Sequence, residues 1–139
     1  MSTKTEATIE DLYKVEGKAE IVNGEILHMP PTGERPGYAG DEIFASLREH
    51  ARRTGTGRAV GDNKAFVVNL PHRKSFSPDA AFQIGALPGP KFYEGAPVFA
   101  VEVRSAGDPE NPTVYRRGES AEAEPALPGW SMPVADLFV

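Results

Sequence analysis

Apolar and largely β-branched residues run almost unbroken from Val98 to Val103, and one acidic residue, Glu102, interrupts the run. A run of this kind predicts a strand that is covered on both faces. An ionised carboxylate buried there costs free energy unless a cation or hydrogen-bond donors meet it. Upstream, Asp79 opens a second apolar strand that ends near Ile84. Two neighbouring strands that each carry one inward carboxylate would form a site for a hard divalent cation.

The two acidic residues can share one ion only if their strands adjoin. In that case Asp79 and Glu102 would both reach one Mg²⁺ or Mn²⁺ ion, completed by waters and the Val103 carbonyl oxygen. Such an ion would activate a water molecule for attack on a phosphodiester. The alternative is structural: Asp79 caps a turn, and Glu102 forms an ion pair with Arg104, on the same face of its strand, or with Arg58.

The N-terminal third of the chain predicts a short helix, a hairpin and one long helix. We expect the short helix over residues 8–16, with Thr8 as its N-cap. An Asn-Gly dipeptide between two β-rich runs indicates a hairpin with strands at about residues 19–22 and 25–29. Residues 30–37 are rich in proline and glycine and predict a loop. Apolar residues at helical spacing then indicate the one substantial helix, which ends at Gly55.

The remaining elements are expected to be strands and turns. Residues 58–61 and 64–70 predict a second hairpin, and residues 70–75 a polar turn before the next strand. Residues 113–115 could form a short strand. The apolar residues of the tail, residues 116–139, lie mostly near its end, so we expect that tail to cross the core as an extended segment.

Composition indicates an ordinary globular protein with one domain over residues 1–139. Hydrophobic residues make up 40% and charged residues 25% of the chain. No apolar run approaches the ~20 residues of a membrane span, so we expect no membrane partner. The absence of cysteine and of an apolar N-terminal segment suits a cytoplasmic protein. The net charge of -5 argues against avid nonspecific binding to nucleic acid.

Five features in order resemble a known family. They are a hairpin at residues 20–26, a long helix, Ser-Pro-Asp at 77–79, Pro-Val-Phe-Ala-Val-Glu-Val-Arg-Ser at 97–105 and a closing Leu-Pro-Gly-Trp segment from 127. Together they resemble the Uma family of "putative restriction endonucleases", which has the PD-(D/E)XK nuclease-like fold. The resemblance runs from about residue 10 to the C-terminus. It implies an α/β restriction-endonuclease-like fold, with a mixed β-sheet, one main α-helix and an N-terminal hairpin.

The resemblance also implies an activity and a site. Asp79 and Glu102 match the family's metal-binding acids, with Mg²⁺ or Mn²⁺ as cofactor, and the activity would be hydrolysis of phosphodiester bonds in DNA. Glu20 matches an acidic residue that would approach the same site as a third ligand; its alternative is a solvated edge residue. The second function to weigh is a catalytically inactive nuclease-fold protein that serves as a binding or oligomerising module.

The chain departs from the family pattern after Ser105. A helix bearing a lysine and a Trp-containing strand are expected there, but the sequence continues almost at once to its terminal part, so it reads as a shortened copy. Arg104 stands where the family's lysine would stand; it could orient phosphate but cannot act as a general base, because it stays protonated. A shortened sheet would leave an open edge and apolar surface, so we expect a homodimer.

Overall fold

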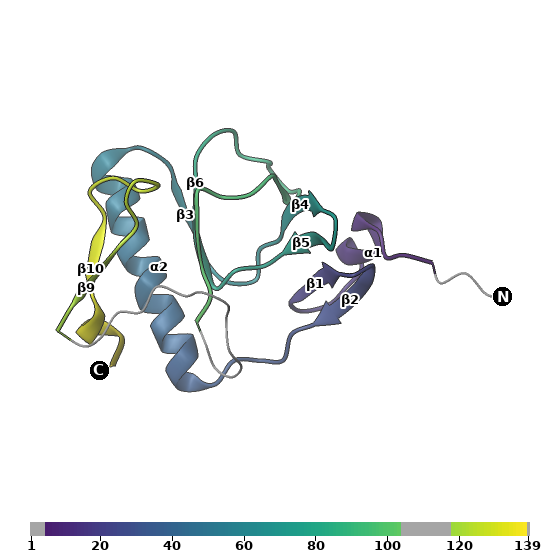
Figure 1. Cartoon of the computed structure of the whole chain (residues 1–139), viewed down its shortest axis with the longest axis horizontal. Helices are drawn as coiled ribbons and strands as arrows, with labels where there is room; N and C mark the ends of the chain where they lie inside the picture. The colour runs from purple at the N-terminus through teal and green to yellow at the C-terminus, as the bar shows by residue number, and fades with distance from the viewer. Residues whose placement is uncertain (1–4, 104–117, 139) are drawn as a thin grey trace. The chain divides into compact units, whose positions relative to one another are not determined.

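The computed structural model describes residues 5–103 and 118–138, and the chain forms two compact units. Each unit is built from three separate segments of the chain. Unit 1 comprises Met1–Pro31, Asp62–Pro78 and Ala86–Ala96, and unit 2 comprises Thr32–Gly61, Asp79–Gly85 and Pro97–Val139. Figure 1 labels most of the helices and strands of both. The single domain that the sequence predicts over residues 1–139 stays a prediction, and the two units are described in turn.

Unit 1 contains a mixed β-sheet and one short helix. Its strands are β1 (Ala19–Val22), β2 (Glu25–His28), β4 (Phe66–Leu70), β5 (Arg73–Phe76) and β7 (Tyr93–Glu94), and its helix is α1 (Ile9–Tyr13). The strands lie in the order β2-β1-β5-β4-β7. β4 and β7 run parallel, whereas the other neighbours run antiparallel. Leu12, Ala19 and Ile21 form the core of the unit.

The local signals at the N-terminus are confirmed. Asn23 and Gly24 both have positive φ, 51° and 76°, as the tight turn of a two-residue hairpin requires. Thr8 caps α1: its hydroxyl accepts a hydrogen bond from the Asp11 N–H at 3.2 Å, while the Asp11 carboxylate accepts one from the Thr8 N–H at 2.9 Å. This reciprocal pair satisfies two N–H groups that a helix start leaves without intrahelical partners.

The second hairpin that the sequence predicts is wrong. β3 (Arg58–Val60) belongs to unit 2 and pairs with β6 (Ala80–Gln83), whereas β4 pairs with β5. The predicted polar turn at 70–75 is confirmed for Pro71 and His72, whereas Leu70 ends β4 and residues 73–75 belong to β5. Pairing follows side-chain packing: the ring of Phe66 on β4 lies 5.6 Å from that of Phe76 on β5, and Phe66 is fully buried. Turn residues show where the chain bends, but burial decides which strands pair.

Unit 2 packs one long helix, α2 (Glu34–Thr54), against a three-stranded antiparallel sheet. The sheet has the order β3-β6-β8, and β8 spans Phe99–Val101. The C-terminal segment adds an antiparallel pair, β9 (Ser120–Glu122) with β10 (Ser131–Pro133), and a 3₁₀ helix, η1 (Val134–Phe138). Leu47 of α2, Phe82 of β6 and Trp130 of the tail meet in one buried cluster.

The tail enters the core as predicted, although as a hairpin instead of a single extended segment. Leu127, Trp130, Met132 and Val134 are all buried. The Trp130 Nε1–H donates to the Ser46 hydroxyl at 3.1 Å, so the one polar atom of the indole ring has a partner on α2. The strand predicted at 113–115 lies outside the described residues.

Helix α2 begins earlier than the sequence predicts. It starts at Glu34, so the predicted loop at 30–37 is wrong for its last four residues. Pro36 lies in the first helical turn, where its missing N–H costs nothing because that N–H would have no intrahelical acceptor. The other end is confirmed: Gly55 has φ 67° and donates to the Ala51 carbonyl at 2.8 Å.

The described structure is mixed α/β with one main helix, which confirms the predicted architecture. None of its helices combines the length and hydropathy needed to cross a bilayer.

His50 is buried on α2. It is 2% exposed and contacts Phe82 edge-on, with 5.8 Å between ring centres. Arg53 Nη2 donates to His50 Nδ1 at 3.3 Å, so the ring proton lies on Nε2. Burial, and then the Arg53 charge, lower the pKa of His50 below its usual 6.5.

We expect His50 to make the chain less stable in mild acid. Below pH 6.5 the unfolded state binds a proton at His50 that the folded state excludes. The free energy of unfolding therefore decreases as the pH is lowered, by at most about 1.4 kcal/mol per pH unit. Urea unfolding from pH 7.5 to pH 5 measures this slope. His50→Leu should flatten it, whereas His72→Gln, which changes an exposed histidine, should keep it. Equal slopes in both variants would contradict the assignment.

Candidate metal centre where β6 begins and β8 ends

The two acidic residues predicted to share an ion lie at the adjoining ends of two paired strands. β6 and β8 are antiparallel neighbours, with Phe82 opposite Phe99 and Ala80 opposite Val101. Asp79 immediately precedes the first residue of β6, and Glu102 immediately follows the last residue of β8. The prediction that the two strands adjoin is therefore confirmed, and both acids belong to unit 2.

Asp79 is bound to the backbone of the β8 segment by two hydrogen bonds. Its own N–H donates to the Val101 carbonyl at 2.9 Å, and its Oδ2 accepts from the Val103 N–H at 2.6 Å. A charged acceptor makes the second bond short and strong. The carboxylate is half-buried, so it is held in place while part of it still faces solvent.

Glu102 is exposed, which differs from the expectation of a strand covered on both faces. β8 is an edge strand of the sheet in the part of the chain that the structure describes, and Ala100 on it and Val98 just before it are exposed as well. The β-branched run reflects strand propensity here, not complete burial. The carboxylate of Glu102 therefore faces water and does not need a buried cation to offset desolvation.

A glycine of α2 lies against this junction. Gly40 is buried, and a Cβ atom added to it would lie 3.8 Å from Asp79 Cβ and 3.9 Å from Val103 Cγ2. The gap between the helix backbone at Gly40 and these two residues is therefore just wide enough for one methyl group. Sequence reasoning passed over this residue; the signal was a glycine inside a helical pattern, which usually marks close packing.

Tyr38, two residues before Gly40 on α2, lies among acidic side chains. Burial raises the pKa of Tyr38, and the neighbouring carboxylates of Glu42 and Asp136 raise it further, because the phenolate would add a third negative charge. Tyr38 therefore stays a neutral phenol, and its hydroxyl is hydrogen-bonded to the Glu42 side chain. The sequence analysis did not single it out.

Glu20 is buried in unit 1, so the alternative of a solvated edge residue is wrong. It is 6% exposed. Its Oε1 accepts from Arg73 Nη1 at 2.6 Å, and its Oε2 accepts from the Ser77 N–H at 2.8 Å. Both oxygens thus have donors within their own unit, which is how a buried carboxylate is stabilised. The idea that Glu20 is a third metal ligand stays a prediction.

The remaining predicted site residues differ in what the structure says of them. Val103 is half-buried, and its N–H is engaged by Asp79, while Arg104 lies outside the described residues. Within residues 5–103 and 118–138 no three His, Asp or Glu residues gather closely enough to hold a metal ion. The arrangement at the junction is thus a pair of carboxylates, one tightly held and one exposed.

The chain resembles known proteins in two comparisons. The model of the Uma2 family, described as "Putative restriction endonuclease", matches residues 7–114. A crystal structure from Anabaena variabilis ATCC 29413, described as a "putative nuclease belonging to DUF820", matches with a TM-score of 0.53 at 15% identity. The match covers 69% of this chain and 57% of the Anabaena chain, and shows a shared fold of the restriction-endonuclease-like type. No curated protein matches.

We expect Asp79→Ala to lower the free energy of unfolding by about 1.5–3 kcal/mol, because it removes the charged acceptor of the Val103 N–H. Asp79→Asn retains a carbonyl oxygen that can accept the same bond, and should cost about 1 kcal/mol. Urea unfolding at pH 7 gives both values. Equal losses in the two variants would show that the hydrogen bond does not hold this junction.

Two glycine variants should report how closely α2 and the strands pack. Gly40→Ala adds a methyl group in ordinary contact and should raise the free energy of unfolding by up to about 1 kcal/mol, because alanine favours helix. Gly57→Ala is the matched contrast: its Cβ would lie 2.6 Å from the Gln83 carbonyl oxygen, so a loss of about 1–3 kcal/mol is expected. A loss of that size for Gly40→Ala would contradict the contact at Asp79.

Proposed function

Because the chain belongs to the Uma2 family, described as "Putative restriction endonuclease", we propose that it is a metal-dependent endonuclease that hydrolyses phosphodiester bonds in DNA. The proposed centre is the junction of β6 and β8. One observation carries this choice: the Asp79 carboxylate is fixed by the N–H of Val103, the residue next to Glu102. Asp79 and Glu102 also flank two paired strands of the same unit, which supports the choice of these two acids.

The donors at the junction fit a hard divalent cation. Mg²⁺ prefers oxygen ligands, keeps several waters and is usually bound by one or two carboxylates instead of a full protein cage. Asp79 and Glu102 supply two carboxylates, and the Val103 carbonyl oxygen is a third donor close in sequence. A bound Mg²⁺ or Mn²⁺ ion would supply Lewis-acid stabilisation of phosphoryl charge and a water of lowered pKa.

The chain's own residues would divide the remaining work. The hydrogen bond from Val103 fixes one oxygen of Asp79, so that carboxylate is held in a set orientation before substrate arrives. Glu102 is exposed and can be reached by a polymer as large as DNA. Arg104 would contribute a permanent positive charge that orients a phosphate through paired N–H donors. Glu20, whose two oxygens already accept hydrogen bonds, is assigned here to the stability of unit 1.

The setting of this activity is proposed on the same basis. The net charge of -5 disfavours broad electrostatic attraction to DNA, so binding would depend on a few local contacts and would weaken only moderately with salt. A homodimer and a cytoplasmic location remain our proposals, the first from the open edge and apolar surface that a shortened sheet would leave, and the second from the polar N-terminal segment together with the absence of cysteine.

We expect the purified chain to nick or linearise plasmid DNA in Mg²⁺ or Mn²⁺ and to be inactive with EDTA. Asp79→Asn and Glu102→Gln should each lower the rate by at least about 100-fold, because each removes a charge from the metal centre. Glu49→Gln, which changes an exposed carboxylate on α2, is the control and should cleave normally. Gel assays of supercoiled plasmid measure the rates.

Calorimetric titration with Mn²⁺ separates the proposed enzyme from its alternative. The inactive binding module would be favoured if the unchanged chain binds Mn²⁺ without cleaving DNA and Asp79→Asn loses that binding. If the folded chain neither binds Mn²⁺ nor cleaves DNA, the proposal is wrong.

A further inference from the structure

Glu20 contacts the chain just ahead of Asp79, although the proposed function gives it no part in the metal centre. Its Oε2 accepts at 2.8 Å from the N–H of Ser77, which stands two residues before Asp79. Its Oε1 accepts from Arg73 Nη1 at 2.6 Å. Because β5 spans Arg73–Phe76, this one side chain of β1 binds the first residue of β5 and the residue that follows its last.

The backbone has little freedom between Ser77 and Asp79. Pro78, the single residue between them, is fully buried. Its ring fixes its own φ and disfavours a helical conformation at Ser77. After the proline, the Asp79 N–H donates to the Val101 carbonyl at 2.9 Å. The chain is therefore bound to a partner on each side of one proline, and Glu20 is the partner on the N-terminal side.

Stability alone does not explain a charged pair at this place. Glu20 is 6% exposed, and a buried ion pair can often be replaced by apolar residues of similar volume without loss of stability. An apolar residue could not accept a hydrogen bond from the N–H of Ser77, which is also buried. A charged acceptor makes that bond strong and fixes where the backbone of Ser77 lies.

We propose that Glu20 is a positioning residue for Asp79. It holds the Ser77 N–H, and Pro78 carries that constraint to the carboxylate that the Val103 N–H binds. This role rests on the proposed function, because only that function makes Asp79 a metal ligand. Residues that orient a metal ligand through hydrogen bonds commonly change metal affinity by about 10–100-fold when they are replaced.

Two paired substitutions separate positioning from stability. Glu20→Gln with Arg73→Gln removes both charges but retains a side-chain oxygen that can accept from the Ser77 N–H. Glu20→Leu with Arg73→Leu retains a similar volume but supplies no acceptor, and such apolar replacements of a buried pair usually fold. The two variants therefore differ in the one contact that the proposal depends on.

Amide hydrogen exchange of the full chain without metal, followed by NMR, is the first measurement. The Val103 N–H, which the Asp79 carboxylate binds, should exchange at least about fivefold faster in the leucine pair than in the glutamine pair, the equivalent of one net hydrogen bond. The Leu127 N–H donates to the Ala123 carbonyl in the same unit and should exchange equally in both variants.

Calorimetric titration with Mn²⁺ is the second measurement. The leucine pair should bind Mn²⁺ about tenfold more weakly than the unchanged chain, and the glutamine pair within about twofold of it. Equal losses in both pairs would make the Glu20 charge itself part of the metal site and would overturn a positioning role. If the unchanged chain binds no Mn²⁺, the proposed function is wrong, and amide exchange still decides whether Glu20 positions Asp79.

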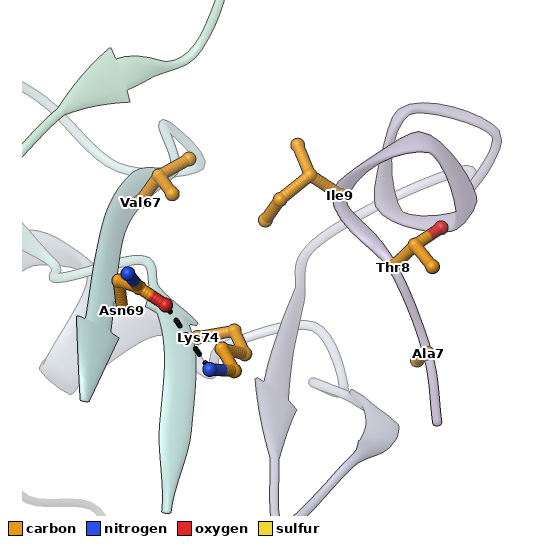
Figure 2. Close-up of a pocket in the computed structure, with 6 residues that line it drawn as sticks. All are labelled: Ala7, Thr8, Ile9, Val67, Asn69 and Lys74. Atoms are coloured by element: carbon orange, nitrogen blue, oxygen red, sulfur yellow. Dashed lines mark hydrogen bonds between the residues drawn. The ribbon is translucent and has the colours of Figure 1, made fainter. Parts of the chain in front are cut away.

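Lys74, next to Arg73 on β5, provides the control. Its ammonium donates to the Asn69 side-chain oxygen at 3.0 Å, beside a pocket of about 170 Å³ in unit 1, as Figure 2 shows. Lys74→Gln removes a charge from the same strand and leaves Glu20 and its two partners in place. Amide exchange at Val103 and Mn²⁺ binding should therefore equal those of the unchanged chain.

If the leucine pair does not fold, Glu20→Asp takes its place. The flexible Arg73 side chain can follow the shorter carboxylate, whereas the backbone N–H of Ser77 cannot, so exchange at Val103 should increase in the same way. Equal exchange at Val103 with and without the acceptor would show that Glu20 serves only the stability of unit 1. Unchanged Mn²⁺ affinity in the variant without the acceptor would overturn the proposal as well.

Discussion

The geometry of the proposed centre depends on one hydrogen bond, from the Val103 N–H to the Asp79 carboxylate. The backbone hydrogen bonds between β6 and β8 end at this point, and the Asp79 carboxylate accepts the Val103 N–H in place of a backbone carbonyl. The bond links the first strand to the residue that follows Glu102, so the position of one acid is tied to the chain that carries the other. A charge-assisted bond of this length resists rearrangement better than a solvated turn would.

The chain uses carboxylates in two opposite ways. Glu20 is enclosed by an arginine and a backbone N–H, and its charge is neutralised within the fold. Breaking such a buried pair on one side usually costs more than the pair contributes, because the other charge is left uncompensated. Asp79 is half-buried and Glu102 is exposed, so a ligand from solvent can approach them more readily than it can approach Glu20. Solvent exposure thus distinguishes Glu20, which has a structural role, from Asp79 and Glu102, which are proposed to bind a metal ion.

Sequence reasoning succeeded where the chemistry is local. Thr8 and the Asn23-Gly24 pair fix a cap and a turn through their own backbone and side-chain preferences. The adjacency of the Asp79 and Glu102 strands was a condition of the shared-ion hypothesis, and the pairing of β6 with β8 meets that condition. The family resemblance supported the same two positions.

Sequence reasoning failed where distant packing decides. β3 and β4 join different sheets, although a turn lies between them, because their partners follow much later in the chain. Burial of Glu20 depends on Arg73, 53 residues away, and no local pattern indicates that pair. Pro36 was read as a loop residue, but the first turn of a helix accepts it.

The interleaving of the two units has a consequence for how the chain can be assembled. Each unit draws on three stretches separated by stretches of the other, so neither can be produced by cutting the gene at a single boundary. Synthesis at the ribosome must deliver β8 before the sheet of unit 2 can close, because β6 lies between β3 and β8. Such long-range closure slows folding, because the entropy of closing a long loop is lost before the contacts between the strands form.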